Sequence, residues 1–489
     1  MNYFSTRNDK GAFSAAQAMA MGLAPDGGLF VPETIPTVTL DELKALCAMD
    51  YRARAVNIMQ RFLADFSKEE LEGFVKNAYA DNFDHPDVAP LRFTDEHTAF
   101  LELWHGPTCA FKDMALQMLP YLLTASLKKA GEARQVCILV ATSGDTGKAA
   151  LEGFADVPGT KIFVFYPSGG VSAIQRLQMV TQRGDNVGVC AVKGNFDDAQ
   201  TGVKRIFGDA DFAAELSGRG YFLSSANSIN WGRLLPQVVY YFSAYCDFVN
   251  HGGLKAGEEL VFCVPTGNFG NILAGWFASR MGLPVKRFVC ASNANDVLTE
   301  FIHTGVYNKN RPFHLTISPS MDILVSSNLE RLLYMLCGDE KTRGFMAQLS
   351  ADGCYDVGET VRAQIGEQFY ASCCDDTATK ARIAEMWNTK HYLIDTHTAV
   401  AADAIAHYRA ETGDETPAVV VSTASPFKFA ADVCAALDLA CGDDPLSALS
   451  DFCAIPVPKP LSGLDQRAVR FDGVTDKAEM RAVVDGFLR

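Results

Sequence analysis

Short, continuous apolar runs recur along this chain of 489 residues, and each is followed by a turn of small and polar residues. Three of them lie at residues 136–140 (VCILV), 260–264 (LVFCV) and 418–421 (AVVV). Uncharged runs of this length, rich in β-branched residues, are typical of strands that are buried on both faces of a parallel sheet. A helix-compatible pattern follows each turn. This alternation predicts an α/β fold built on open parallel sheets.

The two ends of the chain follow different patterns. Helical periodicity covers residues 40–49 and 68–82. Ser67 and Glu70 form a capping-box pattern ahead of the second stretch, in which each side chain accepts a hydrogen bond from the other residue's backbone. The first 95 residues are therefore expected to form an N-terminal domain. A cluster of prolines in the stretch from about Pro445 predicts an irregular arm that ends in a final helix.

The turns after the three strands carry groups suited to an anionic ligand. Residues 141–147 (ATSGDTG) offer backbone N–H groups, hydroxyls and one carboxylate at a helix N-terminus. Residues 265–271 (PTGNFGN) combine glycines, which allow close backbone approach, with a helix N-terminus, which favours an anion. Residues 422–426 (STASP) place hydroxyls at the carboxyl end of a strand, where open α/β sheets bind ligands. One such turn alone is more often an ordinary helix cap, so the prediction depends on their combination.

A lysine completes this set of groups. Lys112 follows a Gly-Pro turn and an apolar pair in residues 105–113 (HGPTCAFKD), and an apolar run follows it. Desolvation there would lower the pKa of the amine and make it nucleophilic, as a Schiff-base lysine requires. Most lysines are solvated, so this motif alone is weak. Together with the three turns it offers an amine, an anion cradle and polar groups for a heteroaromatic ring, which is what binding of pyridoxal phosphate requires.

The chain closely resembles the threonine synthases, which are pyridoxal-phosphate enzymes of the tryptophan-synthase-β-like fold type. The resemblance covers essentially the whole chain, and the long region before Lys112 is similar to that of the bacterial and fungal branch. The matching motifs occur in the family's order at residues 27–32 (GGLFVP), 105–113, 141–147, 227–233 (NSINWGR), 267–271, 318–323 (SPSMDI), 395–400 (DTHTAV) and 422–429.

The resemblance implies a fold and a division into domains. The fold is pyridoxal-phosphate fold type II, in which two open α/β domains hold the cofactor in the cleft between them, here with an additional N-terminal domain. The implied domains are an N-terminal domain at residues 1–95, a large cofactor-binding domain at residues 96–139 and 236–489, and a small α/β domain at residues 140–235.

The resemblance also implies roles for individual residues. Lys112 would hold the cofactor as a Schiff base, Asp145 would lie near its phenolic oxygen, where many relatives have Asn, and Thr423 would face the pyridine nitrogen. Five residues would wrap the cofactor phosphate, mostly through backbone N–H groups: Gly267, Asn268, Phe269, Gly270 and Asn271.

The same comparison implies contacts with the substrate. Ser143 and Thr146 would contact it, and Asn227 and Arg233 would bind its phosphate. An arginine suits that role because its planar fork binds phosphate oxygens in pairs. The implied reaction converts O-phospho-L-homoserine and water into L-threonine and phosphate by γ-elimination and β-hydration. Two alternatives stay open: a serine or threonine dehydratase of the same fold, and a non-catalytic homologue that binds cofactor or a phosphorylated amino acid.

Composition narrows the possible partners. A net charge of −15 argues against non-specific binding to nucleic acid or to an anionic membrane surface. An anionic substrate must then be met by local basic groups, which increases the interest of Arg233. The chain starts with mixed polar sequence and its longest apolar stretches are only strand-length, so we expect a cytoplasmic protein without a membrane span. A monomer and a homodimer are both compatible with the sequence.

Cysteine and histidine patterns indicate no metal site. The 14 cysteines are scattered and none has Cys-x-x-Cys spacing, which favours buried reduced thiols over disulfides or zinc. The nine histidines include no His-x-x-x-His pair. His105 and His397 lie within the family's motifs, and each is compatible with catalysis or with a purely structural hydrogen bond.

Overall fold

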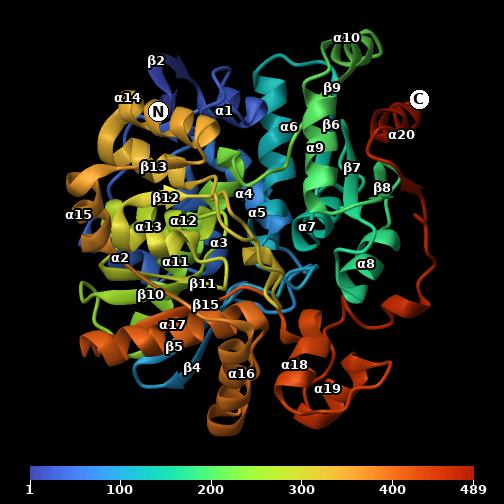
Figure 1. Ribbon diagram of the computed structural model, residues 1–489. Helices are drawn as coiled ribbons and strands as arrows, with labels where there is room; N and C mark the ends of the chain where they lie inside the picture. Colours follow the sequence, from blue (N-terminus) through green and yellow to red (C-terminus); the bar gives the residue numbers. More distant parts are fainter.

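The computed structural model describes residues 1–489, which form two lobes built on separate sheets (Figure 1). The larger sheet has six strands: β4 (Leu91–Asp95), β5 (Thr98–Glu102), β10 (Leu260–Pro265), β11 (Val285–Ser292), β14 (Phe369–Cys373) and β15 (Ala418–Ser422). Their order is β14-β11-β10-β15-β5-β4, and only β4 and β5 pair antiparallel. All residues of β10 and β15, at the centre of the sheet, are buried, as their uninterrupted apolar sequences predicted.

Alternate side chains of β10 point into two separate cores. Phe262 and Val264 contribute to the first core, and Val261 and Cys263 to the second. The first core contains residues of helices α11 (Trp231–His251), α12 (Gly270–Arg280), α13 (Val297–Thr304), α14 (Leu329–Ala351) and α15 (Gly358–Gln368), and of the antiparallel strand pair β12 (Val306–Asn308) and β13 (Cys354–Asp356). The second contains residues of α16 (Asp376–Lys390), α17 (Thr396–Thr412), α18 (Ala430–Ala436) and α19 (Pro445–Cys453).

The smaller sheet is fully parallel. Its strands are β6 (Gln135–Ala141), β7 (Thr160–Pro167), β8 (Val187–Val192), β9 (Tyr221–Ser224) and β16 (Val474–Thr475), in the order β16-β8-β7-β6-β9. Its helices are α6 (Leu119–Lys129), α7 (Asp145–Phe154), α8 (Ala173–Val180), α9 (Phe196–Phe207), α10 (Ala210–Gly218) and α20 (Met480–Phe487). Alternation again divides the side chains of β6, since Ile138 packs with α6 and α7 while Leu139 packs with α9 and α20.

The N-terminal region packs directly onto the larger lobe. It contains strands β1 (Tyr3–Ser5), β2 (Asn8–Phe13) and β3 (Phe30–Pro32) and helices α1 (Ala15–Met21), α2 (Leu40–Cys47), α3 (Tyr51–Gln60) and α4 (Lys68–Ala78). Tyr3 and Phe62 both contact the ring of Trp231 in α11, and the Arg54 guanidinium lies 2.6 Å from Asp247 at the other end of that helix. The region therefore shares one hydrophobic core with the larger lobe instead of forming its own.

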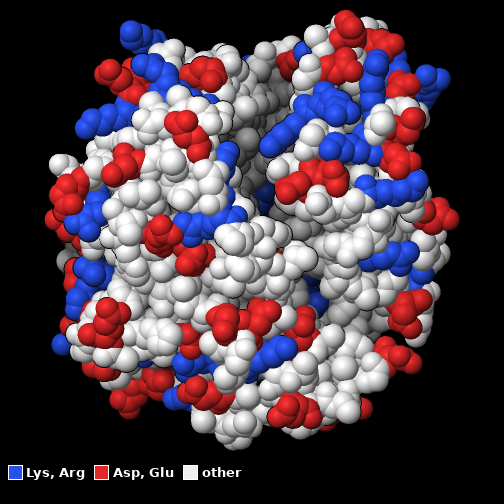
Figure 2. All heavy atoms as spheres, viewed as in Figure 1, with Lys and Arg blue, Asp and Glu red and all other residues white.

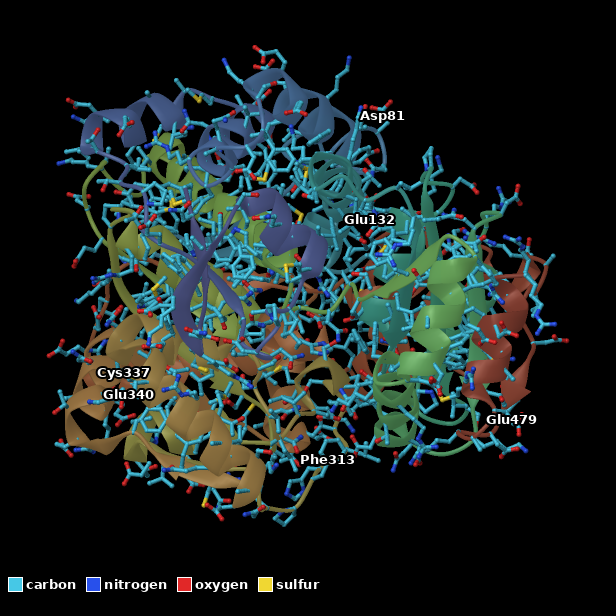
Figure 3. All side chains as sticks on the ribbon, turned by 90° about the horizontal axis from the view of Figure 1, so that it is seen from above. Asp81, Glu132, Phe313, Cys337, Glu340 and Glu479 are labelled. Atoms are coloured by element: carbon cyan, nitrogen blue, oxygen red, sulfur yellow. The ribbon has the colours of Figure 1, made fainter.

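The structure corrects three of the predicted domain boundaries. The boundary at residue 95 falls within the hairpin of β4 and β5. The boundary between residues 139 and 140 cuts β6, and α6 already packs on the smaller sheet. The segment 236–489 does not belong wholly to the larger lobe, because β16 pairs with β8 and α20 joins the smaller lobe's core. Figure 3 shows Glu479, just before α20, at the outer edge of that lobe.

The predictions for individual helices agree more closely with the structure than the predicted domain boundaries do. The capping box of Ser67 and Glu70 is present at the start of α4, although the helix ends at Ala78 instead of continuing to residue 82. Pro445 begins helix α19 and not an irregular arm; the irregular stretch follows that helix, and the predicted final helix is α20. None of the helices combines the length and apolarity that crossing a membrane requires.

Candidate active site

The turns after β6, β10 and β15 meet between the two lobes. Figure 2 shows a deep groove there, with basic side chains along its walls and floor. Lys112 immediately precedes the short helix α5 (Asp113–Leu116), and its loop is tied to the end of β15 by a 2.8 Å hydrogen bond from the Phe111 N–H to the Thr423 carbonyl. Thr423 itself is buried beside this loop.

The Lys112 amine is largely desolvated and has weak partners. The residue is 9% exposed, and its Nζ donates to Ser320 Oγ at 3.4 Å and lies 4.0 Å from Asp145 Oδ2. Burial lowers the pKa of Lys112 to about 8, with the nearby charges of Arg233 and Lys428 acting in the same direction and Asp145 opposing them. A mixture of free amine and ammonium at neutral pH follows, as the sequence pattern predicted.

Asp145, the first residue of α7, is the anion that faces this amine. Its Oδ1 lies 2.6 Å from Lys428 Nζ and accepts a 2.9 Å hydrogen bond from Gln175 Nε2. Burial alone would raise the pKa of Asp145, but Lys428 and Lys112 outweigh it and hold the pKa below its usual range. Lys428 and Gln175 were not among the predicted site residues.

The loop from Gly267 to Asn271 forms a cradle at the start of α12. A Cβ added at Gly267 would lie 2.8 Å from the Ser320 carbonyl oxygen, so no side chain fits there. Phe269 adopts a left-handed conformation with φ 61°, and the Asn328 side chain donates to the Asn268 carbonyl at 3.1 Å.

Asn271 leaves a donor free in this cradle. Its Oδ1 accepts hydrogen bonds from the hydroxyls of Tyr240 and Tyr241 at 2.6 and 2.8 Å, which fixes the amide orientation. Its Nδ2 is buried and has no partner. Together with the N–H groups at the beginning of α12, this amide makes the cradle suited to a phosphate group.

Arg233, in the first turn of α11, is a buried cation without a carboxylate. It is 3% exposed, its Nη1 donates to the Ala226 carbonyl at 2.8 Å, and its Nε has no partner. Burial lowers the pKa of Arg233 to about 10, so the guanidinium stays charged at neutral pH. An unpaired buried charge is costly for the fold and is typical of a site that binds an anion.

The other predicted substrate contacts are more exposed. Ser143 and Thr146 are partly buried in the turn around Asp145. Asn227 is exposed, and its backbone N–H donates to Ser225 Oγ at 3.2 Å. The structure therefore brings Lys112, Asp145 and Thr423 together and leaves Asn227 at the surface.

The two motif histidines have different surroundings. His105 lies between Asp84, at 2.6 Å from Nδ1, and Glu102, at 2.9 Å from Nε2. Burial would lower the pKa of His105, but the two carboxylates raise it to about 9. This arrangement favours the structural role, since His105 links the N-terminal region to β5.

His397 positions Ser320. Its Nε2 accepts a 3.1 Å hydrogen bond from the Ser320 backbone N–H, and its Nδ1 lies 2.8 Å from Asp395 Oδ2. Because Nε2 accepts, Nδ1 must carry the ring proton and donate it to Asp395. Asp322 also holds this segment, because its carboxylate accepts a 2.7 Å hydrogen bond from the Thr316 hydroxyl. This segment lies within residues 318–323, one of the family's motifs, but Ser320 was not among the predicted site residues.

Comparison with known proteins identifies the family. Residues 2–79 match the model described as threonine synthase N terminus, residues 96–424 that of pyridoxal-phosphate dependent enzymes, and residues 398–484 that of the threonine synthase C-terminal region. The threonine synthase of Pseudomonas aeruginosa is 40% identical over 435 residues, which cover 88% of this chain and 89% of that protein. The chain belongs to the threonine synthase family.

Other relatives and solved structures agree with this membership. Human Threonine synthase-like 1 is 40% identical over 437 residues, which cover 87% of this chain and 58% of that protein, so the chain spans well under two thirds of this relative's length. The structure of the threonine synthase from Brucella melitensis, with pyridoxal phosphate bound, superposes with a TM-score of 0.89 at 37% identity over the whole of both chains. For yeast threonine synthase the TM-score is 0.90 at 33% identity, covering 100% of this chain and 98% of that one.

Pyridoxal phosphate is the cofactor of this family, and the residues of the site fit it. The unpaired Asn271 amide and the N-terminus of α12 can hold its phosphate, and Lys112 supplies a buried amine for its aldehyde. The observed fold is likewise that of the predicted fold type, with the two lobes on either side of this site (Figure 1).

Proposed function

We propose that this protein converts O-phospho-L-homoserine and water into L-threonine and phosphate, with Lys112 holding pyridoxal phosphate as a Schiff base. The observation that carries the proposal is Arg233, a buried guanidinium without a carboxylate partner. Its charge acts on the Lys112 amine and lowers the pKa of that amine. A phosphorylated substrate neutralises such a group, whereas a dehydratase acting on serine or threonine has no use for it.

The residues of the site divide the work of this reaction. Bound pyridoxal phosphate supplies an electron sink for the substrate carbons. Lys112, with a pKa lowered to about 8 by burial, can both accept and release protons at neutral pH. It takes protons from Cα and Cβ and returns them to Cγ and Cα. Water supplies the Cβ hydroxyl and the proton taken up by the leaving phosphate.

Arg233 and the turn around Asp145 place the substrate for these steps. The Arg233 guanidinium holds the phosphate on Cγ before and after the C–O bond breaks. Ser143 and Thr146 offer hydroxyls at the N-terminus of α7, which suits the substrate carboxylate.

The test is a product assay with the purified, cofactor-loaded protein. Given O-phospho-L-homoserine, it is expected to release threonine and inorganic phosphate in equal amounts. Ammonia and a keto acid from serine or threonine would instead identify a dehydratase. Tight binding of phosphohomoserine without any product, from protein with normal cofactor absorption, would identify a binding protein.

A hydroxyl next to Lys112 gives a further prediction. Ser320 Oγ lies 3.4 Å from both Lys112 Nζ and Asp145 Oδ2, so it can hold the amine in place between proton transfers. Replacing Ser320→Ala is expected to lower kcat about tenfold, or ~1.4 kcal/mol, with little change in KM. Steady-state kinetics measure both.

Ser318→Ala is the matched control for this variant. The Ser318 hydroxyl accepts from Asn293 Nδ2 at 3.0 Å and does not bond Lys112. This change is expected to lower stability by about 1 kcal/mol and to leave kcat near the wild-type value. Equal losses of kcat in both variants would mean that the segment matters only for folding.

We also propose that the protein works in the cytoplasm, as a monomer or homodimer, on a small-molecule substrate and without binding nucleic acid or a membrane. All 14 cysteines are free, and nine of them are buried. Thiols of this kind suit a reducing compartment.

A further inference from the structure

A second lysine of the site has no role in the reaction described above. Lys428 lies in a short 3₁₀ turn (Pro426–Phe429) after β15, and its side chain is completely buried. Its ammonium donates to the Thr108 carbonyl at 3.0 Å and lies 2.6 Å from Asp145 Oδ1. A buried ammonium is strongly destabilising unless it is paired, so the burial of Lys428 depends on its ion pair with Asp145.

The ion pair connects the two lobes. Lys428 and Thr108 belong to the larger lobe, whereas Asp145 begins α7 of the smaller one. Gln175, at the start of α8, supports the carboxylate from the same side, since its Nε2 donates to Oδ1 at 2.9 Å. Oδ1 of Asp145 is therefore fully engaged.

The other oxygen of Asp145 faces the reacting amine. Oδ2 lies 3.4 Å from Ser320 Oγ and 4.0 Å from Lys112 Nζ. Two lysines thus share the Asp145 carboxylate, and the Lys428 ammonium lies closer to it, at 2.6 Å, than the Lys112 amine, at 4.0 Å. Without Lys428, the same carboxylate would be free to pair with Lys112 alone.

We propose that Lys428 is a positioning residue of the active site, whose ammonium neutralises Asp145 and so keeps Lys112 out of a fixed ion pair with it. A free Lys112 amine is what the proposed function needs, and the inference rests on that function only in taking Lys112 as the reacting group. Lys428 also leaves the site with a net positive charge, because Arg233 has no carboxylate of its own. This excess suits a substrate phosphate.

The charges around Lys112 set the direction of the effect. Burial, Arg233 and Lys428 lower the pKa of Lys112 to about 8, while Asp145 and Asp113 raise it. Removing the Lys428 charge leaves Asp145 to act on Lys112 undivided, so the pKa must rise. A rise of about one unit means about tenfold less free amine at neutral pH.

The test measures the proton on Lys112 directly. In the full-length protein freed of cofactor, the rate at which an amine-reactive reagent labels Lys112 is followed against pH by mass spectrometry. Lys428→Met is expected to raise the midpoint by about one unit, and Lys428→Arg, which keeps the charge, to leave it within a few tenths. In the cofactor-loaded protein, the pH midpoint of the cofactor's absorption change is expected to move in the same direction.

Variants of Asp145 separate charge from structure. Asp145→Asn is expected to lower the Lys112 midpoint, and Asp145→Asn with Lys428→Met is expected to keep it below wild type, because Asp145 has the stronger influence on Lys112. If Lys428→Met does not fold, Lys428→Gln retains a hydrogen-bond donor without the charge and should give the same rise. A midpoint that is unchanged or lower in the neutral Lys428 variants would overturn the proposal. Because the label reports a proton and not threonine, this result is independent of the product assay.

Discussion

Replacing Lys112→Ala is expected to lower kcat for O-phospho-L-homoserine by about 10⁴-fold or more, because one side chain supplies both the covalent attachment and the base. The side chain is 10% exposed and makes only one weak hydrogen bond, to Ser320, so its loss should cost little stability. Single-turnover measurements with saturating cofactor, together with thermal unfolding, separate the two effects. The cofactor absorption band of the Schiff base should also be lost.

Two comparisons make this prediction specific to the amine. Lys112→Arg keeps a cation but cannot form the Schiff base, so it should be as inactive as the alanine variant. A small primary amine added to Lys112→Ala should restore part of the activity, because it can occupy the vacated space. Lys148, equally buried but paired with Glu152 at 2.6 Å, is the control; Lys148→Ala should lower stability and leave the folded protein active. A Lys112→Ala protein with a tenth of wild-type kcat would remove the Schiff-base assignment.

The strands and caps could be predicted because their signals are local. The uninterrupted apolar run at residues 260–264 can only be satisfied by burial on both faces, and β10 has cores on both sides. The capping box at Ser67 likewise involves neighbours three residues apart. Pro445 was misinterpreted because proline was taken as a breaker, whereas at the first position of α19 its missing N–H costs nothing.

The lobe boundaries could not be predicted because they depend on strand pairings and helix packing between segments far apart in the sequence. β16 is only two residues long, and its place beside β8 is decided by contacts across the sequence. Most of β6 was assigned to the wrong lobe because the boundary was placed between residues 139 and 140, close to the polar turn that follows the strand, and not before the helix α6 that packs with it. Edges of sheets are set by tertiary contacts, and propensity does not contain them.

The site residues likewise divide into those with local sequence signals and those brought together only by tertiary contacts. Lys112 and the Gly267 loop were predicted from turns in which the candidate groups are close in sequence. Ser320 approaches Lys112 across 208 residues, and Lys428 meets Asp145 across the two lobes. The sequence offered one signal for Lys428, which is that this lysine lies within the apolar segment Pro426–Phe429. A lysine buried in such a segment requires a partner for its ammonium.

Replacing Arg233→Met is expected to move activity and stability in opposite directions. The kcat/KM for O-phospho-L-homoserine should fall about 10²- to 10³-fold, because two charge-assisted hydrogen bonds to phosphate are worth roughly 3–4 kcal/mol together. The free energy of unfolding should stay the same or rise by about 1 kcal/mol, because the guanidinium is buried with an unpaired Nε and no carboxylate. Steady-state kinetics and denaturant unfolding of the same preparation measure both.

Arg54→Met is the matched control, since Arg54 is buried to the same 3% but pairs with Asp247 at 2.6 Å. Its loss leaves a partly buried carboxylate unpaired, so stability should fall by about 3 kcal/mol while the folded protein keeps its kcat/KM. Because the two arginines are equally buried, the difference between the two variants in stability and in kcat/KM measures the effect of the missing carboxylate partner at Arg233. If Arg233→Met destabilised the protein as Arg54→Met does and kept the wild-type kcat/KM, the guanidinium would be a structural group, and the main support for a phosphorylated substrate would be lost.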